Sequence, residues 1–278
     1  MKSYHRIVQA LRSLYPEREA AALTRWILEA RFGLSQTDIL LDKDNHLSAE
    51  SLEDAEEIVA RLLRHEPIQY ILGEVDFCNH RFSVAPGALI PRPETEELVF
   101  HILQSLSKPA PAILDVGTGT GCIALSLALA LPSSQVTAWD ISEEALSIAR
   151  SNGQRYSEAH VSFERQDILS PVSDNRQWDV IVSNPPYICE KEAMDMTPNV
   201  LDYEPRTALF VPDDNPLLFY RAIARFARTR LTPQGMLWFE INEAYGKETK
   251  CLLEGEGFRK AEVMKDIHGK DRFLKVER

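Results

Sequence analysis

The stretch with the clearest chemical meaning lies at residues 181–188, which read Ile-Val-Ser-Asn-Pro-Pro-Tyr-Ile. Its aliphatic start is typical of the end of a buried strand, and open α/β sheets place their active sites at the carboxyl ends of strands. Because proline has no backbone N–H, the Asn184 side-chain oxygen and the Pro185 carbonyl are acceptors with few competing donors, and Tyr187 beyond Pro186 adds an aromatic face. The stretch predicts a site for a planar NH2 group, such as a carboxamide or the exocyclic amine of a base, unless it is only a loop that leaves a strand.

A glycine-rich turn lies upstream, between the apolar run 112–116 and a helical apolar pattern that ends at Leu131. The turn consists of Gly117, Thr118, Gly119, Thr120 and Gly121. Glycines there allow positive φ angles and the close approach of a ligand to the backbone. The dinucleotide fingerprint requires Gly-x-Gly-x-x-Gly, whereas here the third glycine comes one residue early and Cys122 follows it. The spacing therefore favours the Gly-x-Gly-x-Gly loop of S-adenosylmethionine enzymes, and we predict that these five residues bind the cofactor.

An acidic residue ends the next predicted strand, at residues 135–139. An acid at this place can accept hydrogen bonds from both hydroxyls of a ribose, which makes Asp140 a candidate cofactor ligand. Asp140 can also be a helix-start acid before Glu143 and Glu144, because negative charge is favourable at a helix N-terminus. The two interpretations are compatible with each other.

Together these motifs resemble the bacterial peptide chain release factor N5-glutamine methyltransferases, a family of class I S-adenosylmethionine-dependent protein methyltransferases. The resemblance extends over nearly the whole chain. The matching segments are residues 65–73, 90–96, 115–121, 184–187 and 203–209, with Lys265, Asp266, Gly269 and Arg272 in the tail. The sequence Asn-Pro-Pro-Tyr is shared with adenine-N6 methyltransferases, whereas Pro-Arg-Pro-Glu-Thr-Glu and Tyr-Glu-Pro-Arg-Thr-Ala are more specific to this family.

The resemblance implies a seven-stranded sheet, a cofactor and roles for further residues. It implies that S-adenosylmethionine binds, that Ile168 lies near the adenine where a related member carries a Trp, and that Asp167 contacts the adenine amine or forms a turn. It implies that Asp115 faces the cofactor ammonium or orders the loop as a strand-end acid. Arg92 and residues 94–96 are placed over the cofactor edge, and they also fit a capped helix start.

The implied reaction is methyl transfer to the N5 amide nitrogen of the glutamine in the Gly-Gly-Gln motif of class 1 release factors. Asn184 and Pro185 would accept the two amide hydrogens, Pro186 would add to the substrate site, and Tyr187 would pack on the amide plane or be a packed loop aromatic. A carboxamide nitrogen is a poor nucleophile because its lone pair is delocalised. We therefore expect catalysis by orientation and electrostatic stabilisation, with no metal and no dedicated base.

The domain organisation follows from the periodicity of apolar residues. Residues 1–75 repeat apolar side chains at three- and four-residue spacing, which predicts a helical substrate-recognition domain. Residues 76–90 alternate around turn residues and predict a hairpin linker. Residues 91–278 alternate strands and helices and predict a doubly wound, mostly parallel α/β sheet, the methyltransferase domain. Strands are expected near 112–116, 135–139, 160–164, 178–183, 235–241, 258–264 and 271–277, the last two as an antiparallel pair at the edge.

Composition narrows the class of partner and the compartment. The formal charge is −11, which argues against duplex DNA as the main substrate, because binding to nucleic acid depends on Lys and Arg at phosphates. The four cysteines are scattered, the histidines show no metal-ligand spacing, no apolar stretch is long enough for a membrane span, and the N-terminus lacks an apolar signal core. We therefore expect a cytoplasmic enzyme with no direct nucleic acid substrate and no membrane. Glutamine methylation of a ribosomal protein, adenine methylation of nucleic acid and a non-catalytic cofactor-binding adaptor are the alternatives.

Overall fold

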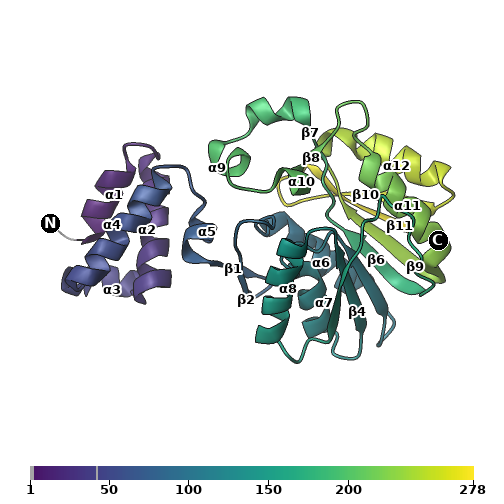
Figure 1. The fold of residues 1–278 in the computed structure, drawn as a ribbon, viewed down its shortest axis with the longest axis horizontal. Coiled ribbons are helices and arrows are strands. Elements are labelled where there is room, and N and C mark those ends of the chain that lie inside the picture. Colours follow the sequence, from purple (N-terminus) through teal and green to yellow (C-terminus); the bar gives the residue numbers. More distant parts are fainter. Residues whose placement is uncertain (1–2, 42) are drawn as a thin grey trace. The chain divides into compact units, whose positions relative to one another are not determined.

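A computed structural model describes residues 3–41 and 43–278 (Figure 1). By its internal contacts the chain divides into two compact units. The smaller unit comprises the residues up to Glu74 together with Thr197–Tyr203, and the larger comprises Val75–Met196 and Glu204–Arg278. The short segment Thr197–Tyr203 is therefore remote in sequence from the rest of the unit to which it belongs.

The smaller unit is helical. Its elements are α1 (Ser3–Leu11), α2 (Glu17–Phe32), α3 (Gln36–Leu40), the 3-10 helix η1 (Lys43–His46), α4 (Ala49–Leu62), α5 (Ile68–Leu72) and α9 (Pro198–Leu201). Apolar side chains at helical spacing form its core, among them Leu11, Ile27, Leu28 and Leu62. The Ser48 hydroxyl caps α4 by accepting a hydrogen bond from the Ser51 backbone N–H, 3.1 Å away.

A short hairpin follows the first five α-helices. Its strands are β1 (Glu74–Phe77) and β2 (His80–Ser83). Cys78 and Asn79 between them have φ angles of 48° and 62°. Two consecutive positive φ angles are what a two-residue turn needs in order to follow the right-handed twist of its strands.

The larger unit is built on a seven-stranded sheet. Its strands are β3 (Ala112–Val116), β4 (Gln135–Asp140), β5 (Val161–Arg165), β6 (Trp178–Ser183), β9 (Leu231–Glu240), β10 (Arg259–Lys265) and β11 (Asp271–Glu277). Their spatial order is β10-β11-β9-β6-β3-β4-β5, and β11 is antiparallel to both of its neighbours. The predicted mostly parallel sheet, with an antiparallel pair at its edge, is confirmed.

Helices cover both faces of the sheet because the strand side chains alternate. Ile113 and Val180 pack on one face, with α6 (Pro93–Ser105) and α7 (Cys122–Ala130). Leu114 and Ile181 pack on the other face, with α11 (Leu218–Arg230) and α12 (Gly246–Gly255). α8 (Glu143–Arg155) follows β4. This is the class I methyltransferase arrangement that the resemblance implied.

One region of short elements was not predicted. After β6 the chain forms β7 (Ile188–Cys189), η2 (Glu190–Asp195), α9, α10 (Arg206–Leu209) and β8 (Phe210–Val211), and a further turn, η3 (Glu243–Tyr245), follows β9. β7 and β8 pair in parallel as a separate small sheet. Elements of two to six residues are too short to repeat a hydrophobic pattern, so the sequence carried no signal for them.

Candidate active site

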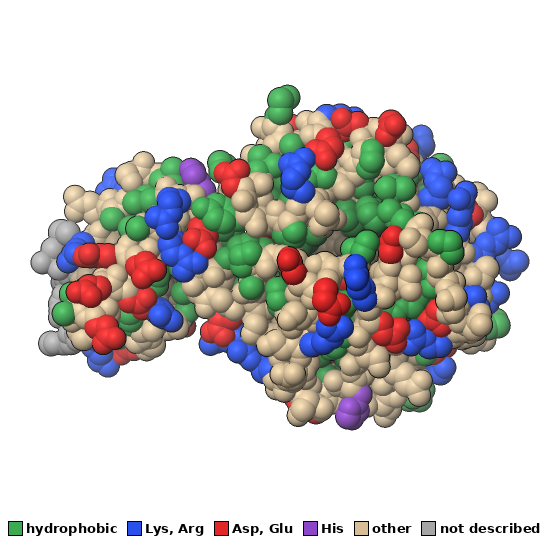
Figure 2. All heavy atoms as spheres, in the orientation of Figure 1, with side chains coloured by type: hydrophobic (Ala, Val, Ile, Leu, Met, Phe, Trp, Pro, Cys, Tyr) green, Lys and Arg blue, Asp and Glu red, His purple; other side chains and the backbone are tan. Residues whose placement is uncertain are grey.

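A cavity of about 380 Å³ opens in the larger unit. It lies at the carboxyl ends of β3, β4 and β6, with the start of α11 as a further wall. Its walls are mainly apolar, and Figure 2 shows hydrophobic side chains gathered around this hollow in the right-hand part of the view. Ligand sites are typically such concave, mostly apolar pockets of roughly 300–1,000 Å³ with a few polar groups placed in them.

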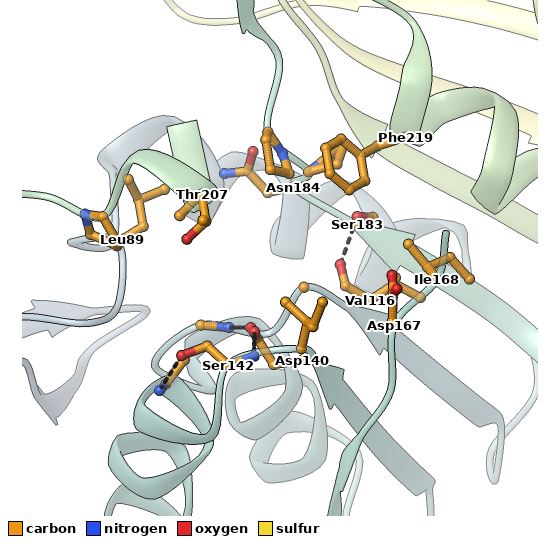
Figure 3. Close-up of a pocket in the computed structure, with 18 of the residues that line it drawn as sticks. Leu89, Val116, Asp140, Ser142, Asp167, Ile168, Ser183, Asn184, Thr207 and Phe219 are labelled. Carbon is orange, nitrogen blue, oxygen red and sulfur yellow. Dashed lines mark hydrogen bonds between the residues drawn. The ribbon is translucent and has the colours of Figure 1, made fainter. Parts of the chain in front are cut away.

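The polar groups of the cavity lie on opposite sides. Figure 3 shows Asp140 and Ser142 on one side and Asn184 with Phe219 across from them. Asp140 is the last residue of β4, Ser142 follows two residues later, and Asn184 comes directly after β6. The parallel strands thus bring together two residues that are far apart in the chain.

The structure brings most of the predicted site residues to this cavity. Those that line it are Gly117, Gly119, Asp140, Ile168, Asn184, Pro185 and Pro186. Thr118, Thr120 and Gly121 belong to the same glycine turn but do not line the cavity, and Tyr187 is turned away from it. Asp167 also lines the cavity, whereas Arg92 and Thr95 do not.

Glycine stands at three positions of the turn for two different structural reasons. Gly117 and Gly119 have φ angles of 76° and 57°, and a Cβ atom on either would meet nothing within 4 Å. The space beside these two residues is therefore open to a ligand. Gly121 has a φ of 81°, and a Cβ there would lie 3.2 Å from the Ala149 Cβ and 3.3 Å from Phe163 Cε1. Gly121 is thus required for the packing of the turn.

Asp140 joins the glycine turn to the next helix. Its Oδ2 accepts a hydrogen bond from the Gly119 N–H at 2.9 Å, and its Oδ1 accepts one from the Ser142 N–H at 2.9 Å. Ser142 in turn caps α8 through the Ala145 N–H. Burial raises the pKa of Asp140, and the backbone N–H groups of Ser142 and Gly119 oppose that shift. Each carboxylate oxygen has a second lone pair, so Asp140 can still accept from a ligand.

Asp115 is the most deeply buried acid of the turn. Its Oδ2 accepts a hydrogen bond of 2.6 Å from the Thr118 hydroxyl. Its Oδ1 and the nearby Thr120 hydroxyl have no hydrogen-bond partner within the described part of the chain. Burial raises the pKa of Asp115 to about 7, and the nearby Asp140 adds to the rise. A buried polar atom without a partner is costly, so Asp115 Oδ1 is an acceptor ready for a donor or a water.

Asn184 is held by a buried polar network behind the cavity wall. Its Nδ2 donates to the Thr95 hydroxyl at 3.3 Å, and that hydroxyl donates to Glu240 Oε2 at 2.7 Å. The Tyr187 hydroxyl donates to Glu240 Oε1 at 3.1 Å. Burial raises the pKa of Glu240, and its bonds to Thr95 and Tyr187 and the Arg272 charge oppose the shift. Burial, followed by the Glu240 charge, raises the pKa of Tyr187.

Two further candidates, Arg92 and Asp167, are engaged by partners within the protein. Arg92 Nη2 donates to Glu204 Oε1 at 2.5 Å, and Glu204 Oε2 accepts from the Ile90 N–H at 3.0 Å. This pair joins the two segments that are most specific to the family in the sequence. Asp167 accepts from the Leu169 N–H at 2.8 Å, as a turn residue does, while it also borders the cavity.

Comparison with known proteins identifies the family. A family model described as the PrmC N-terminal domain matches residues 4–73, and one described as the methyltransferase small domain matches residues 96–203. A release factor glutamine methyltransferase from Bacteroides thetaiotaomicron is 50% identical over 98% of this chain and 98% of its own length. The chain belongs to the release factor glutamine methyltransferase family. A second release factor glutamine methyltransferase, from Flavobacterium psychrophilum, is 44% identical over 99% of this chain and 98% of its own length.

Membership of this family makes the chain a methyltransferase, and a solved structure agrees in fold. The 16S rRNA N2 G1207 methyltransferase of Thermus thermophilus, solved with AdoMet and guanosine, superposes with a TM-score of 0.54. It shares 17% identity and covers 74% of this chain and 49% of its own. At that identity the likeness concerns the fold alone.

Several residues that line the cavity or lie behind its wall were not predicted from the sequence. Leu218 and Phe219 at the start of α11 line the cavity. Leu89 and Thr207 also line it. Glu240 lies behind Asn184. The sequence feature that could have predicted its role is an acid at the end of a strongly apolar strand.

The described residues contain no group of three or more His, Cys, Asp or Glu that could hold a metal ion. Across residues 3–41 and 43–278 no helix is long and apolar enough to cross a membrane.

Proposed function

We propose that this methyltransferase transfers the methyl group of S-adenosylmethionine to the side-chain N5 of the glutamine in the Gly-Gly-Gln motif of class 1 release factors. One observation carries the proposal. Asn184 Nδ2 is engaged by Thr95, so its Oδ1 remains for an incoming NH2 group at the cavity, across from Asp140. The names of the relatives, which are release factor glutamine methyltransferases, support this choice of NH2 group.

The cavity fits the cofactor by the residues it presents. The open space beside Gly117 and Gly119 admits a ligand to the backbone, and Asp140 offers acceptors for ribose hydroxyls. Asp115 does not itself line the cavity, and its buried Oδ1 would serve an ammonium group through a water. Ile168 and Phe219 form an apolar wall suited to a flat base, with Phe219 as its aromatic side chain. When bound, the cofactor supplies a methyl group that its sulfonium already activates.

The protein acts on the glutamine by orientation and electrostatics. Asn184 Oδ1 and the Pro185 carbonyl accept the two amide hydrogens and hold the nitrogen toward the methyl donor. Positive charge grows on that nitrogen as the new bond forms, and two fixed acceptors stabilise it. Holding the reacting atoms about 3–3.5 Å apart removes much of the entropic cost. The methylated nitrogen then releases one of its two protons to water, which leaves a neutral N-methyl amide, so no side chain has to act as a strong base.

The Tyr187 role is revised within this proposal. The sequence left two roles open for Tyr187, a ring packed on the substrate amide or a packed loop aromatic. Its hydroxyl is bonded to Glu240 and its side chain does not line the cavity, which supports the second role. We propose that Tyr187 supports the loop that carries Asn184 and Pro185. Pro186 lines the cavity beside them and restricts the backbone of that loop.

We also propose that the helical unit recognises the release factor, and that the reaction takes place in the cytoplasm. The test compares the full chain with a chain that begins at Val75, on an intact release factor and on a short peptide with the Gly-Gly-Gln motif. Truncation should lower kcat/KM for the intact factor, leave the peptide reaction unchanged, and leave cofactor binding intact. Equal kcat/KM for the intact factor would refute the recognition role.

The main experiment identifies the methyl acceptor. The protein is incubated with radiolabelled S-adenosylmethionine and, separately, a class 1 release factor, ribosomal proteins and DNA. Label should enter the release factor and be absent from a factor whose Gly-Gly-Gln glutamine is changed to alanine. Label in the ribosomal proteins or the DNA alone would overturn the proposal and favour one of the alternative methyl acceptors.

A further inference from the structure

A chain of buried hydrogen bonds connects Asn184 to the end of β9. Asn184 Nδ2 lies 3.3 Å from Thr95 Oγ1, which lies 2.7 Å from Glu240 Oε2. Tyr187 Oη lies 3.1 Å from Glu240 Oε1. Thr95 and Glu240 are only 3% and 1% exposed. Bulk water is therefore not available to replace either partner.

The chemistry of these groups determines which group donates and which accepts in each of these hydrogen bonds. A carboxylate only accepts hydrogen bonds, and a hydroxyl has a single hydrogen to donate. The Thr95 and Tyr187 hydroxyls donate to separate oxygens of Glu240, so both oxygens act as acceptors, and Thr95, whose single hydrogen points to Glu240, can only accept from Asn184. An acceptor selects the NH2 end of the Asn184 carboxamide. The Oδ1 end is then left for a donor in the cavity that Asn184 lines.

We infer that Thr95 and Glu240 are positioning residues that keep the Asn184 carboxamide in the one orientation that presents Oδ1 to the substrate NH2. The inference rests on the proposed function and adds two residues to it. A carboxamide can rotate by half a turn at little steric cost, since its oxygen and nitrogen are nearly equal in size. In the rotated state Asn184 would present NH2 to NH2, two donors facing each other, and would lose the acceptor that the reaction needs.

The same carboxylate also holds the rest of the loop. Glu240 accepts from Tyr187 through its second oxygen, and Asn242 Nδ2, two residues further on, donates to the Tyr187 carbonyl at 3.1 Å. The end of β9 thus fixes both the amide of Asn184 and the backbone that follows it. Neither Thr95 nor Glu240 lines the cavity, so each acts through Asn184.

The first test uses two variants of Thr95 that separate the hydroxyl from the methyl group. Thr95→Val keeps the shape and removes the hydroxyl, whereas Thr95→Ser keeps the hydroxyl and removes a buried methyl. In single-turnover methylation of a release factor, Thr95→Val should be slower than Thr95→Ser by about tenfold, with the cofactor Kd unchanged. A role in packing alone predicts the reverse order, because Val preserves the packing that Ser loses. Equal or reversed rates overturn the inference.

The second test needs no methyl acceptor. The side-chain 15N–1H2 signal of Asn184 is assigned in the wild-type protein by its loss in Asn184→Asp. It should move in Thr95→Val and in Glu240→Gln, and it should stay in place in Thr95→Ser. An unchanged signal in Thr95→Val and Glu240→Gln overturns the inference. The expected shifts, in a wild-type protein that does not methylate release factors, would support the positioning role and refute the proposed function instead.

Discussion

The loop after β3 and the loop after β6 meet at one cavity, yet they are held in different ways. The glycine turn after β3 is stabilised by close neighbours: Thr118 bonds to Asp115, and Gly119 bonds to Asp140 at the tip of the next strand. The loop after β6 depends on groups that are distant in sequence, since Asn184 bonds to a residue 89 positions away. The difference suggests that changes in the first loop alter cofactor affinity, whereas changes around the second alter the rate of transfer.

The largest effect is expected at the loop after β6. Asn184→Ala should lower the single-turnover methylation rate by about 10²–10³, as the loss of one oriented group in an oxyanion hole does. Cofactor affinity, measured by calorimetry, should stay close to that of the wild type. Asn184→Asp keeps an acceptor and should retain more activity than Asn184→Ala. An alanine variant that transfers methyl at a near wild-type rate would show that Asn184 is not catalytic and that the loop after β6 does not control the rate.

The next effect belongs to Asp140, at the end of β4, which holds the loop after β3 through the Gly119 N–H. Asp140→Ala should weaken cofactor binding at least about tenfold, because hydrogen bonds to a charged acceptor contribute roughly 1.5–3 kcal/mol. The rate at saturating cofactor should change much less. Glu143→Ala is the matched control, since Glu143 is an acid in the first turn of α8 that does not line the cavity. Unchanged calorimetric affinity in Asp140→Ala would leave Asp140 as a helix-start acid only.

The buried carboxyl of Asp115 predicts a pH dependence of stability. Burial raises its pKa from 3.8 to about 7 in the folded protein. Between these values the folded state holds a proton that the unfolded state has lost, so the free energy of unfolding falls as pH rises from about 4 to about 7 and then levels off. Glu240 and Asp140 contribute with the same sign.

Asp115→Asn isolates that contribution. In urea unfolding without ligand, the variant should lose less stability than the wild type as the pH rises through this window, by about 4 kcal/mol, since each unit of pKa shift corresponds to about 1.4 kcal/mol. Parallel curves of unfolding free energy against pH for the two proteins would show that the pKa of Asp115 is not raised in the folded state.

The smallest effect concerns the apolar wall of the cavity. Phe219→Leu should weaken cofactor binding a few-fold, since the aromatic contribution beyond burial is about 0.5–1.5 kcal/mol. Ile168→Leu, the control on the same wall, should bind as the wild type does, because it changes shape and leaves the apolar area nearly constant. If Ile168→Leu is the weaker binder, then Ile168 and not Phe219 is the main contact of the base.

Much of the fold could be read from local patterns. The apolar runs at Ala112–Val116 and Trp178–Ser183 were predicted at the observed boundaries, because a buried strand needs a continuous run of such side chains. The small sheet of β7 and β8 was not predicted. Two-residue strands have no period to detect and exist only because their partners are brought alongside.

For the site, the sequence by itself determined which groups stand at the strand ends: the open glycines, Asp140, and the acceptors of Asn184 and Pro185. Their types and spacing suffice, since parallel strands carry their carboxyl ends to one edge. Only the tertiary structure decided which way the Asn184 amide faces, that Tyr187 turns to Glu240, and that Phe219 closes the cavity. The physical reason is that hydrogen-bond direction and packing depend on partners from α6, β9 and α11, whose distances from Asn184 no local pattern encodes.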